Sequence, residues 1–101
     1  MLVLAALSAE ESYGYQLVDR LRDAGLTDLT TGSVYPVLNR LEREGRIASR
    51  LVPSPSGPAR KYYRPTPDGT EELWDSAESW TALDRIVRTV LTAAHTPEEQ
   101  R

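Results

Sequence analysis

Apolar side chains recur every three or four positions in the first quarter of the chain, the spacing of residues on one face of a helix. The opening stretch MLVLAAL predicts a short core helix over residues 2–8. We expect Leu2, Leu4 and Leu7 to face inward. The stretch is far shorter than the ~20 residues that span a bilayer, so we interpret it as part of a globular core.

A second apolar stripe predicts a helix between Ser12 and Gly25. Its inward positions are Tyr13, Leu17 and Leu21. The hydroxyl of Ser12 can accept a hydrogen bond from a free N–H of the first turn, and Gly25 can adopt the left-handed conformation that ends many helices.

The stretch TGSVYPVLNRLEREG predicts a third helix, although it contains Pro36. If Ser33 or one of the two threonines before it is the cap, the proline falls in or just after the first turn. Most N–H groups there have no partner within the helix, so a proline costs little. The residues expected to turn inward are Val37, Leu38 and Leu41. Those expected on or near the exposed side are Ser33, Asn39, Arg40 and Arg43.

Two segments rich in β-branched or aromatic residues follow, RIASRLV and RKYYRPT, and they predict a β-hairpin. The intervening PSPSGPA predicts a loop too long for a two-residue turn. Ile47 and Leu51 can face the core, as can one of Tyr62 and Tyr63.

The last predicted element is a helix that starts at Thr66-Pro67-Asp68, with a cap, a first-turn proline and an acid at the positive end of the helix dipole. Its apolar positions follow a heptad pattern to about Ala94. A helix this long cannot bury both sides on so small a domain, so we predict that it pairs with a second chain. The residues expected at that interface are Leu73, Trp80, Leu83, Val87, Val90 and Leu91. Trp74 is expected to pack on the hairpin or the first helix.

The order of elements therefore predicts a mainly α fold with a small β-hairpin, a winged helix-turn-helix followed by a long helix. We expect the winged helix-turn-helix over residues 1–65, a C-terminal dimerisation helix over residues 66–95 and a disordered tail over residues 96–101.

Composition excludes several kinds of chemistry. The 101 residues contain no cysteine, so disulfides, thiolate metal sites and a cysteine nucleophile are ruled out. The one histidine, His95, has no second metal ligand or base near it in the sequence. We therefore expect no catalysis, metal or cofactor. The absence of cysteine is also compatible with the cytoplasm, which we expect as the location.

The charge is unevenly distributed. The net charge is −3, but residues 31–65 carry seven basic and two acidic side chains, whereas the segments on both sides are acidic. In a winged helix-turn-helix the third helix enters the major groove of DNA, and basic residues of the hairpin, such as Arg60 and Lys61, suit phosphates. For single residues such as Ser33 or Arg40, capping and simple solvation remain alternatives.

Three blocks, YGYQLVDRL, SVYPVLNRLEREG and RKYYRPTPDG, give the chain a close resemblance to the PadR family of bacterial transcriptional regulators. The resemblance covers residues 1 to about 94, and the single helix after the hairpin is similar to the smaller subfamily. It implies a homodimer that binds a palindromic promoter site in double-stranded DNA and represses transcription. The residues that it places at the DNA are Tyr15, Ser33, Tyr35, Pro36, Asn39, Arg40, Arg60 and Lys61.

The resemblance also implies a site for a small planar hydrophobic ligand. Trp80 falls where the multidrug-responsive branch of the family has a tryptophan that faces its twin across a dimer pore. The residues that would line this slot with it are Ala5, Leu73, Ala77 and Asp84, whose charge could attract a cation. Simple packing of Trp80 in the dimer core is the alternative. For the protein as a whole, the alternative is a winged helix that binds another protein and no DNA.

Overall fold

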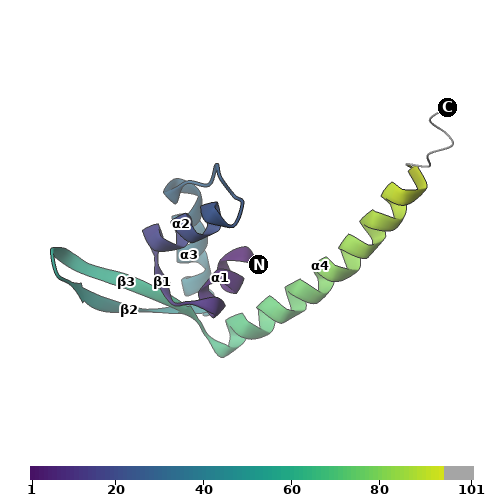
Figure 1. Ribbon diagram of the computed structural model, residues 1–101. Helices are drawn as coiled ribbons and strands as arrows, with labels where there is room; N and C mark the ends of the chain where they lie inside the picture. The colour runs from purple at the N-terminus through teal and green to yellow at the C-terminus, as the bar shows by residue number, and fades with distance from the viewer. Residues whose placement is uncertain (95–101) are drawn as a thin grey trace.

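The computed structural model describes residues 1–94, and its elements form a small body from which one long helix extends (Figure 1). The elements are α1 (Leu2–Ala9), β1 (Ser12–Tyr13), α2 (Gly14–Asp23), α3 (Thr31–Arg43), β2 (Ile47–Ser54), β3 (Gly57–Pro65) and α4 (Pro67–Ala94). His95 and the predicted tail at residues 96–101 lie outside the described residues.

The body is held together by apolar side chains from α1, α2 and α3 that pack on one another and on the base of the sheet. The buried residues are Leu4, Leu7, Leu17, Val18, Leu21, Val34, Leu38, Leu41, Ile47, Tyr63 and Leu73. Most of the inward positions expected from the helical spacing are confirmed. Leu2 is an exception: it is 51% exposed and borders a groove beside α3.

A short strand, β1, was not expected from the sequence. It adds to β3 at the edge opposite β2, with Ser12 paired to Tyr63 and Tyr13 to Tyr62. The prediction that Ser12 caps α2 is wrong. Its buried hydroxyl donates to the carbonyl of Glu10 (3.1 Å) and accepts from the guanidinium of Arg20 (2.7 Å).

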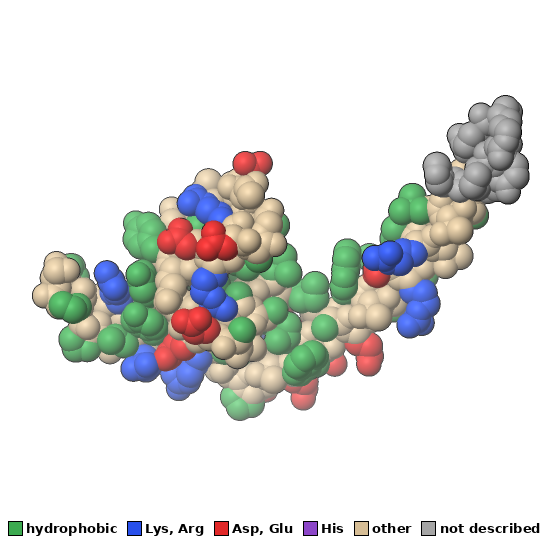
Figure 2. Space-filling model, viewed as in Figure 1, with side chains coloured by type: hydrophobic (Ala, Val, Ile, Leu, Met, Phe, Trp, Pro, Cys, Tyr) green, Lys and Arg blue, Asp and Glu red, His purple; other side chains and the backbone are tan. Residues whose placement is uncertain are grey.

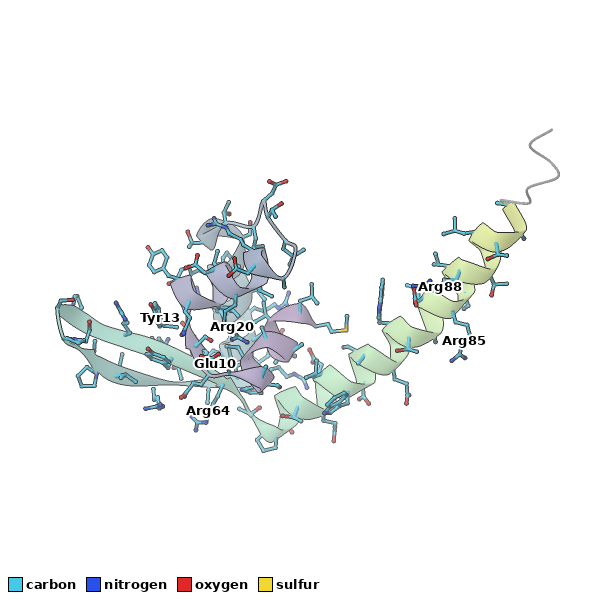
Figure 3. All side chains as sticks on the ribbon, in the orientation of Figure 1. Glu10, Tyr13, Arg20, Arg64, Arg85 and Arg88 are labelled. Carbon is cyan, nitrogen blue, oxygen red and sulfur yellow. The ribbon has the colours of Figure 1, made fainter. Side chains whose placement is uncertain are left out.

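Arg20 explains why the chain turns at this point. Its guanidinium also donates to the carbonyl oxygens of Ala6 (2.8 Å) and Glu10 (3.0 Å), and it lies beside Glu10 in Figure 3. These carbonyls lie at the end of α1, and that of Ala6 also accepts the N–H of Glu10 (3.1 Å). The side chain thus caps α1 and fixes β1 at the same time.

The hairpin is longer and its turn shorter than expected. Ser54 pairs with Gly57, so the turn consists of two residues, and the predicted long loop is wrong. Pro53 is tolerated because β2 is an edge strand and its register is irregular there. Leu51 is 70% exposed rather than buried, because the hairpin projects beyond the helices that could cover it (Figure 1).

Helix α3 has a threonine cap at its start and a glycine after its end, as the sequence indicated. The hydroxyl of Thr30 accepts a hydrogen bond from the N–H of Ser33 (3.2 Å), and Gly45 adopts a φ of 76° just after the helix. Pro36 is the sixth helical residue. It therefore lies about one turn beyond the N–H groups at the start of α3 that have no partner within the helix. Its missing N–H leaves the carbonyl of Gly32 without its usual helical partner, on an exposed face that water can reach.

The end of α3 and the start of α4 are joined by Thr66. Its hydroxyl donates to the carbonyl of Gly45 (2.6 Å) and accepts from the N–H of Gly69 (3.1 Å), so it caps α4, as predicted. The N–H of Thr66 donates to the carbonyl of Arg46 (3.0 Å), and the Arg46 guanidinium forms an ion pair with Glu72 (3.0 Å). We call these contacts the Thr66 joint.

Beyond its first two turns, α4 leaves the body. Leu73 is 6% exposed and packs in the core of its own chain, whereas Trp74 is 67% exposed, contrary to the prediction that it packs on the hairpin or α1. Figure 2 shows hydrophobic side chains along α4 that the body does not cover. The larger ones are Trp80, Leu83, Ile86, Val87, Val90 and Leu91.

The Thr66 joint depends on close approach at Gly69, where a Cβ atom would overlap the carbonyl oxygen of Arg46. We expect Gly69→Ala to lower the free energy of unfolding by about 1–3 kcal/mol, measured by urea denaturation. Gly32→Ala is the matched control in the first turn of α3, where a Cβ meets only ordinary contacts. It should raise stability by up to about 1 kcal/mol. Equal effects of the two substitutions would contradict the close approach.

Candidate nucleic-acid interface

The exposed face of α3 carries the polar residues that the sequence placed there. Pro36, Asn39 and Arg43 lie along its centre, since they recur at helical spacing and all are exposed. Ser33 and Arg40 lie on the side toward α1, where they line an apolar groove with Leu2 and other residues. Arg43 was expected to be exposed but was not included among the DNA contacts predicted from the sequence. Its position one helical turn after Asn39 could have identified it as part of the same face.

Two tyrosines flank this face on the side of the hairpin. Tyr15, at the start of α2, is exposed, and its ring meets that of half-buried Tyr35 edge to face, with centroids 6.2 Å apart. Gly14 permits this arrangement, because a Cβ there would overlap the Tyr35 ring. Burial raises the pKa of the Tyr35 phenol, which therefore stays protonated and able to donate a hydrogen bond at neutral pH.

The two basic residues expected in the hairpin differ in their surroundings. The Arg60 guanidinium lies over the ring of Tyr13, 4.5 Å from its centroid, and makes no ion pair within residues 1–94. The Lys61 amine forms an ion pair with Glu42 of α3 at 2.9 Å. Tyr13, which supports Arg60, was missed as a site residue because it was assigned to the apolar stripe of a helix.

The tyrosines and these bases border one groove of about 570 Å³ between the hairpin and the N-terminal ends of α2 and α3. Its lining residues are Tyr13, Gly14, Tyr15, Tyr35, Ser54, Ser56, Gly57, Pro58, Ala59, Arg60, Lys61 and Tyr63. The structure thus brings four of the eight expected DNA-contacting residues, Tyr15, Tyr35, Arg60 and Lys61, to a single groove. The other four lie on the adjoining exposed face of α3.

Two further bases, Arg50 and Arg64, lie on the same face of the sheet as Arg60, because Arg50 pairs with Tyr62 and side chains two residues apart on a strand share a face. Arg50 binds the Glu11 carboxylate with two hydrogen bonds, of 2.6 and 2.9 Å, and this contact lowers the pKa of Glu11. Arg64 projects away from the helices on this face (Figure 3). Lys61 lies on the other face of the sheet, where it contacts Glu42 of α3.

The residues expected around a ligand are only partly together within one chain. Trp80 is 55% exposed and borders a shallow hollow of about 420 Å³ that Met1 and Leu83 also line. Leu73 belongs to the core, and Ala5 and Ala77 are half-buried. The carboxylate of Asp84 accepts a hydrogen bond from Arg88 (3.0 Å), so its charge is paired.

The described part of the chain offers no cluster of acidic or histidine side chains that could hold a metal ion. Among the helices of residues 1–94, none combines the length and apolar character that crossing a membrane requires.

Three packed helices, with a β-hairpin beside the third, define a winged helix-turn-helix domain, and α4 extends it. The model of the PadR-like family of transcriptional regulators matches residues 3–75, and the chain belongs to this family. It is 35% identical over 91 residues to the transcriptional regulator Rv3488 of Mycobacterium tuberculosis, a match that covers 88% of this chain and 78% of that protein.

Solved structures agree with this assignment. A PadR-like transcriptional regulator from Bacillus cereus is 39% identical, with a TM-score of 0.80 over 88% of this chain and 86% of that chain. PadR of Bacillus subtilis in complex with operator DNA is 26% identical, with a TM-score of 0.68 over 75% of this chain and 44% of that chain. The expected fold and family are confirmed, as is the expectation that the protein is not an enzyme, because the family consists of non-enzymatic regulators.

Proposed function

We propose that the protein is a dimeric transcriptional repressor that binds a palindromic promoter site in double-stranded DNA in the cytoplasm. The observation that carries this proposal is the exposed polar face of α3 beside a groove lined by tyrosines and by Arg60. The similarity to a PadR protein bound to operator DNA supports it.

The geometry suggests how the surface divides its tasks. The centre of α3 enters the major groove, where Asn39 can bind adenine and an arginine such as Arg43 can bind guanine. The hairpin follows the flanking backbone, and Arg60, held over Tyr13, meets a phosphate. Tyr15 and Tyr35 supply hydroxyl groups between these two contacts.

Dimerisation through α4 brings a second winged helix-turn-helix to the DNA. Its uncovered apolar stripe is costly in water, and a second copy of the same stripe covers it. A two-fold axis between the chains makes the preferred DNA site a palindrome, with half-sites about one helical turn apart or a multiple of it. A protein bound across a promoter in this way excludes the transcription machinery, which is the basis for proposing a repressor.

We further propose that a planar hydrophobic ligand releases the DNA by binding beside Trp80. The exposed indole and the adjoining hollow support this proposal. In the dimer, two indoles related by the two-fold axis would leave a flat apolar slot. The ligand would change the separation of the two α3 helices by separating the two α4 helices.

The contact between the hairpin and DNA is tested by the double substitution Arg60→Glu with Lys61→Glu. Reversing two charges beside phosphates should weaken binding at least about 100-fold and reduce its salt dependence, measured by fluorescence anisotropy with DNA from upstream of the protein's own gene. Arg85→Glu with Arg88→Glu is the control, since it changes the net charge equally on the polar side of α4. Unchanged binding after the hairpin substitutions would favour a winged helix that binds another protein.

The dimer is tested by Leu83→Glu, which places a charge in the apolar stripe. We expect the dissociation constant of the dimer to rise at least about tenfold, measured by sedimentation equilibrium. Thr81→Glu adds the same charge on the opposite side of α4 and should leave the dimer intact. A wild-type protein that sediments as a monomer at all working concentrations would sink the proposed dimer.

The ligand site is tested by tryptophan fluorescence. The chain has two tryptophans, so Trp74→Phe leaves Trp80 as the only one. Planar cationic dyes should quench its emission saturably, because an aromatic cation stacks on indole. The reverse variant, Trp80→Phe, should lose this response. If no dye in a broad panel quenches Trp80, its role is confined to packing between the two chains.

A further inference from the structure

Glu42 joins α3 to both strands of the hairpin. One carboxylate oxygen lies 2.9 Å from the amine of Lys61 on β3, and the other accepts a hydrogen bond from the hydroxyl of Ser49 on β2 (2.5 Å). The carboxylate is therefore held on two sides. It points across the space between the recognition helix and the hairpin, toward the base that was expected to meet DNA.

The ion pair between Glu42 and Lys61 lies where it can affect DNA binding. Lys61 lines the groove with Arg60 and Tyr35, and its side chain is 46% exposed. It is the only lysine of the chain. A phosphate that enters the groove can therefore reach the amine. It must either displace the carboxylate of Glu42 from the amine or share the amine with it.

The other bases that face DNA differ in this respect. Arg40, Arg43 and Arg60 make no ion pair within residues 1–94, so each can meet a phosphate or a base without losing a partner. The pairing of Lys61 also persists at neutral pH. The Ser49 hydroxyl and then the Lys61 amine lower the pKa of Glu42, while Glu42 raises the pKa of Lys61, so both groups stay charged.

We propose that Glu42 competes with DNA phosphate for Lys61 and so sets the affinity for DNA below the value that the hairpin could reach. This proposal rests on the proposed DNA-binding function. While Glu42 keeps the Lys61 amine from a phosphate, DNA binding releases fewer counterions than it would with the amine free. The affinity for DNA then depends less strongly on salt concentration. The protein also dissociates more readily when an effector changes the dimer.

The test replaces Glu42 by glutamine, which keeps the shape and the capacity to hydrogen-bond with Ser49. The probe is a duplex that the wild-type dimer selects from a random-sequence library, and affinity is measured over a series of sodium chloride concentrations. We expect Glu42→Gln to bind about 4- to 25-fold more tightly at fixed salt, since each of the two subunits contributes about two- to fivefold, the scale of a surface ion pair. The slope of log affinity against log salt should steepen by about 1.8, because the dimer carries two copies of Lys61 and each added phosphate contact contributes about 0.9.

The matched control is Glu44→Gln, which makes the same change of net charge two residues along the chain at a carboxylate that forms no ion pair within residues 1–94. It should leave the salt slope unchanged. Adding Lys61→Gln to Glu42→Gln should return the slope to the wild-type value, since the freed amine is then missing. Thermal unfolding monitored by circular dichroism checks that each variant is folded.

The outcomes separate the two proposals. If wild-type protein binds DNA but Glu42→Gln has the wild-type slope, or keeps its steeper slope without Lys61, the competition is refuted and DNA binding stands. If the wild-type protein binds no duplex from the library, both proposals fail.

Discussion

The attachment of α4 to the end of α3 is the constraint on which the rest of this protein depends. A single hydroxyl, that of Thr66, caps the long helix and binds the carbonyl that follows the recognition helix. Glycine at position 69 lets the two backbones approach closely, and the ion pair between Arg46 and Glu72 closes the contact from the side. These contacts connect α4, with its uncovered apolar stripe, directly to the end of α3, which carries the exposed polar face.

The electrostatics of the DNA-facing surface follow from how its charges are paired. Residues 31–65 carry an excess of positive charge, yet Arg46, Arg50 and Lys61 are each held by an acid of the same chain. The bases of this segment that make no ion pair within residues 1–94 are Arg40, Arg43, Arg60 and Arg64. A basic segment in a sequence overstates the charge that a folded surface presents.

The sequence predicted most elements of this fold because their signals are local. Helical spacing identified the core leucines, and Thr66, Gly25 and Gly45 marked helix ends through their own chemistry. Strand β1 could not be predicted, because two residues carry no alternation and the side chain that fixes them, Arg20, comes from α2. The hairpin was predicted too short, since proline and serine are typical of loops and only pairing at an edge makes them strand.

The candidate site was predictable residue by residue but not as a set of contacts. Exposure of Asn39 and Arg40 follows from the position of each on its own helix. The groove, the stacking of Arg60 on Tyr13 and the pairing of Lys61 with Glu42 join residues that are 19 or more positions apart. Such contacts depend on how the hairpin lies against α3, which no local pattern reports.

Because α4 extends from the Thr66 joint, the effect of a sideways displacement on the orientation of the body depends on how far along the helix it acts. Trp80 lies 14 residues from Thr66 and Ala94 lies 28, which correspond to about 21 and 42 Å of helix. A sideways displacement of one ångström at Trp80 therefore turns the winged helix-turn-helix body, relative to α4, through about twice the angle that the same displacement causes at Ala94. In the proposed dimer, a ligand of given thickness between the two α4 helices would therefore change the orientation of the α3 helices more if it bound beside Trp80 than if it bound near Ala94.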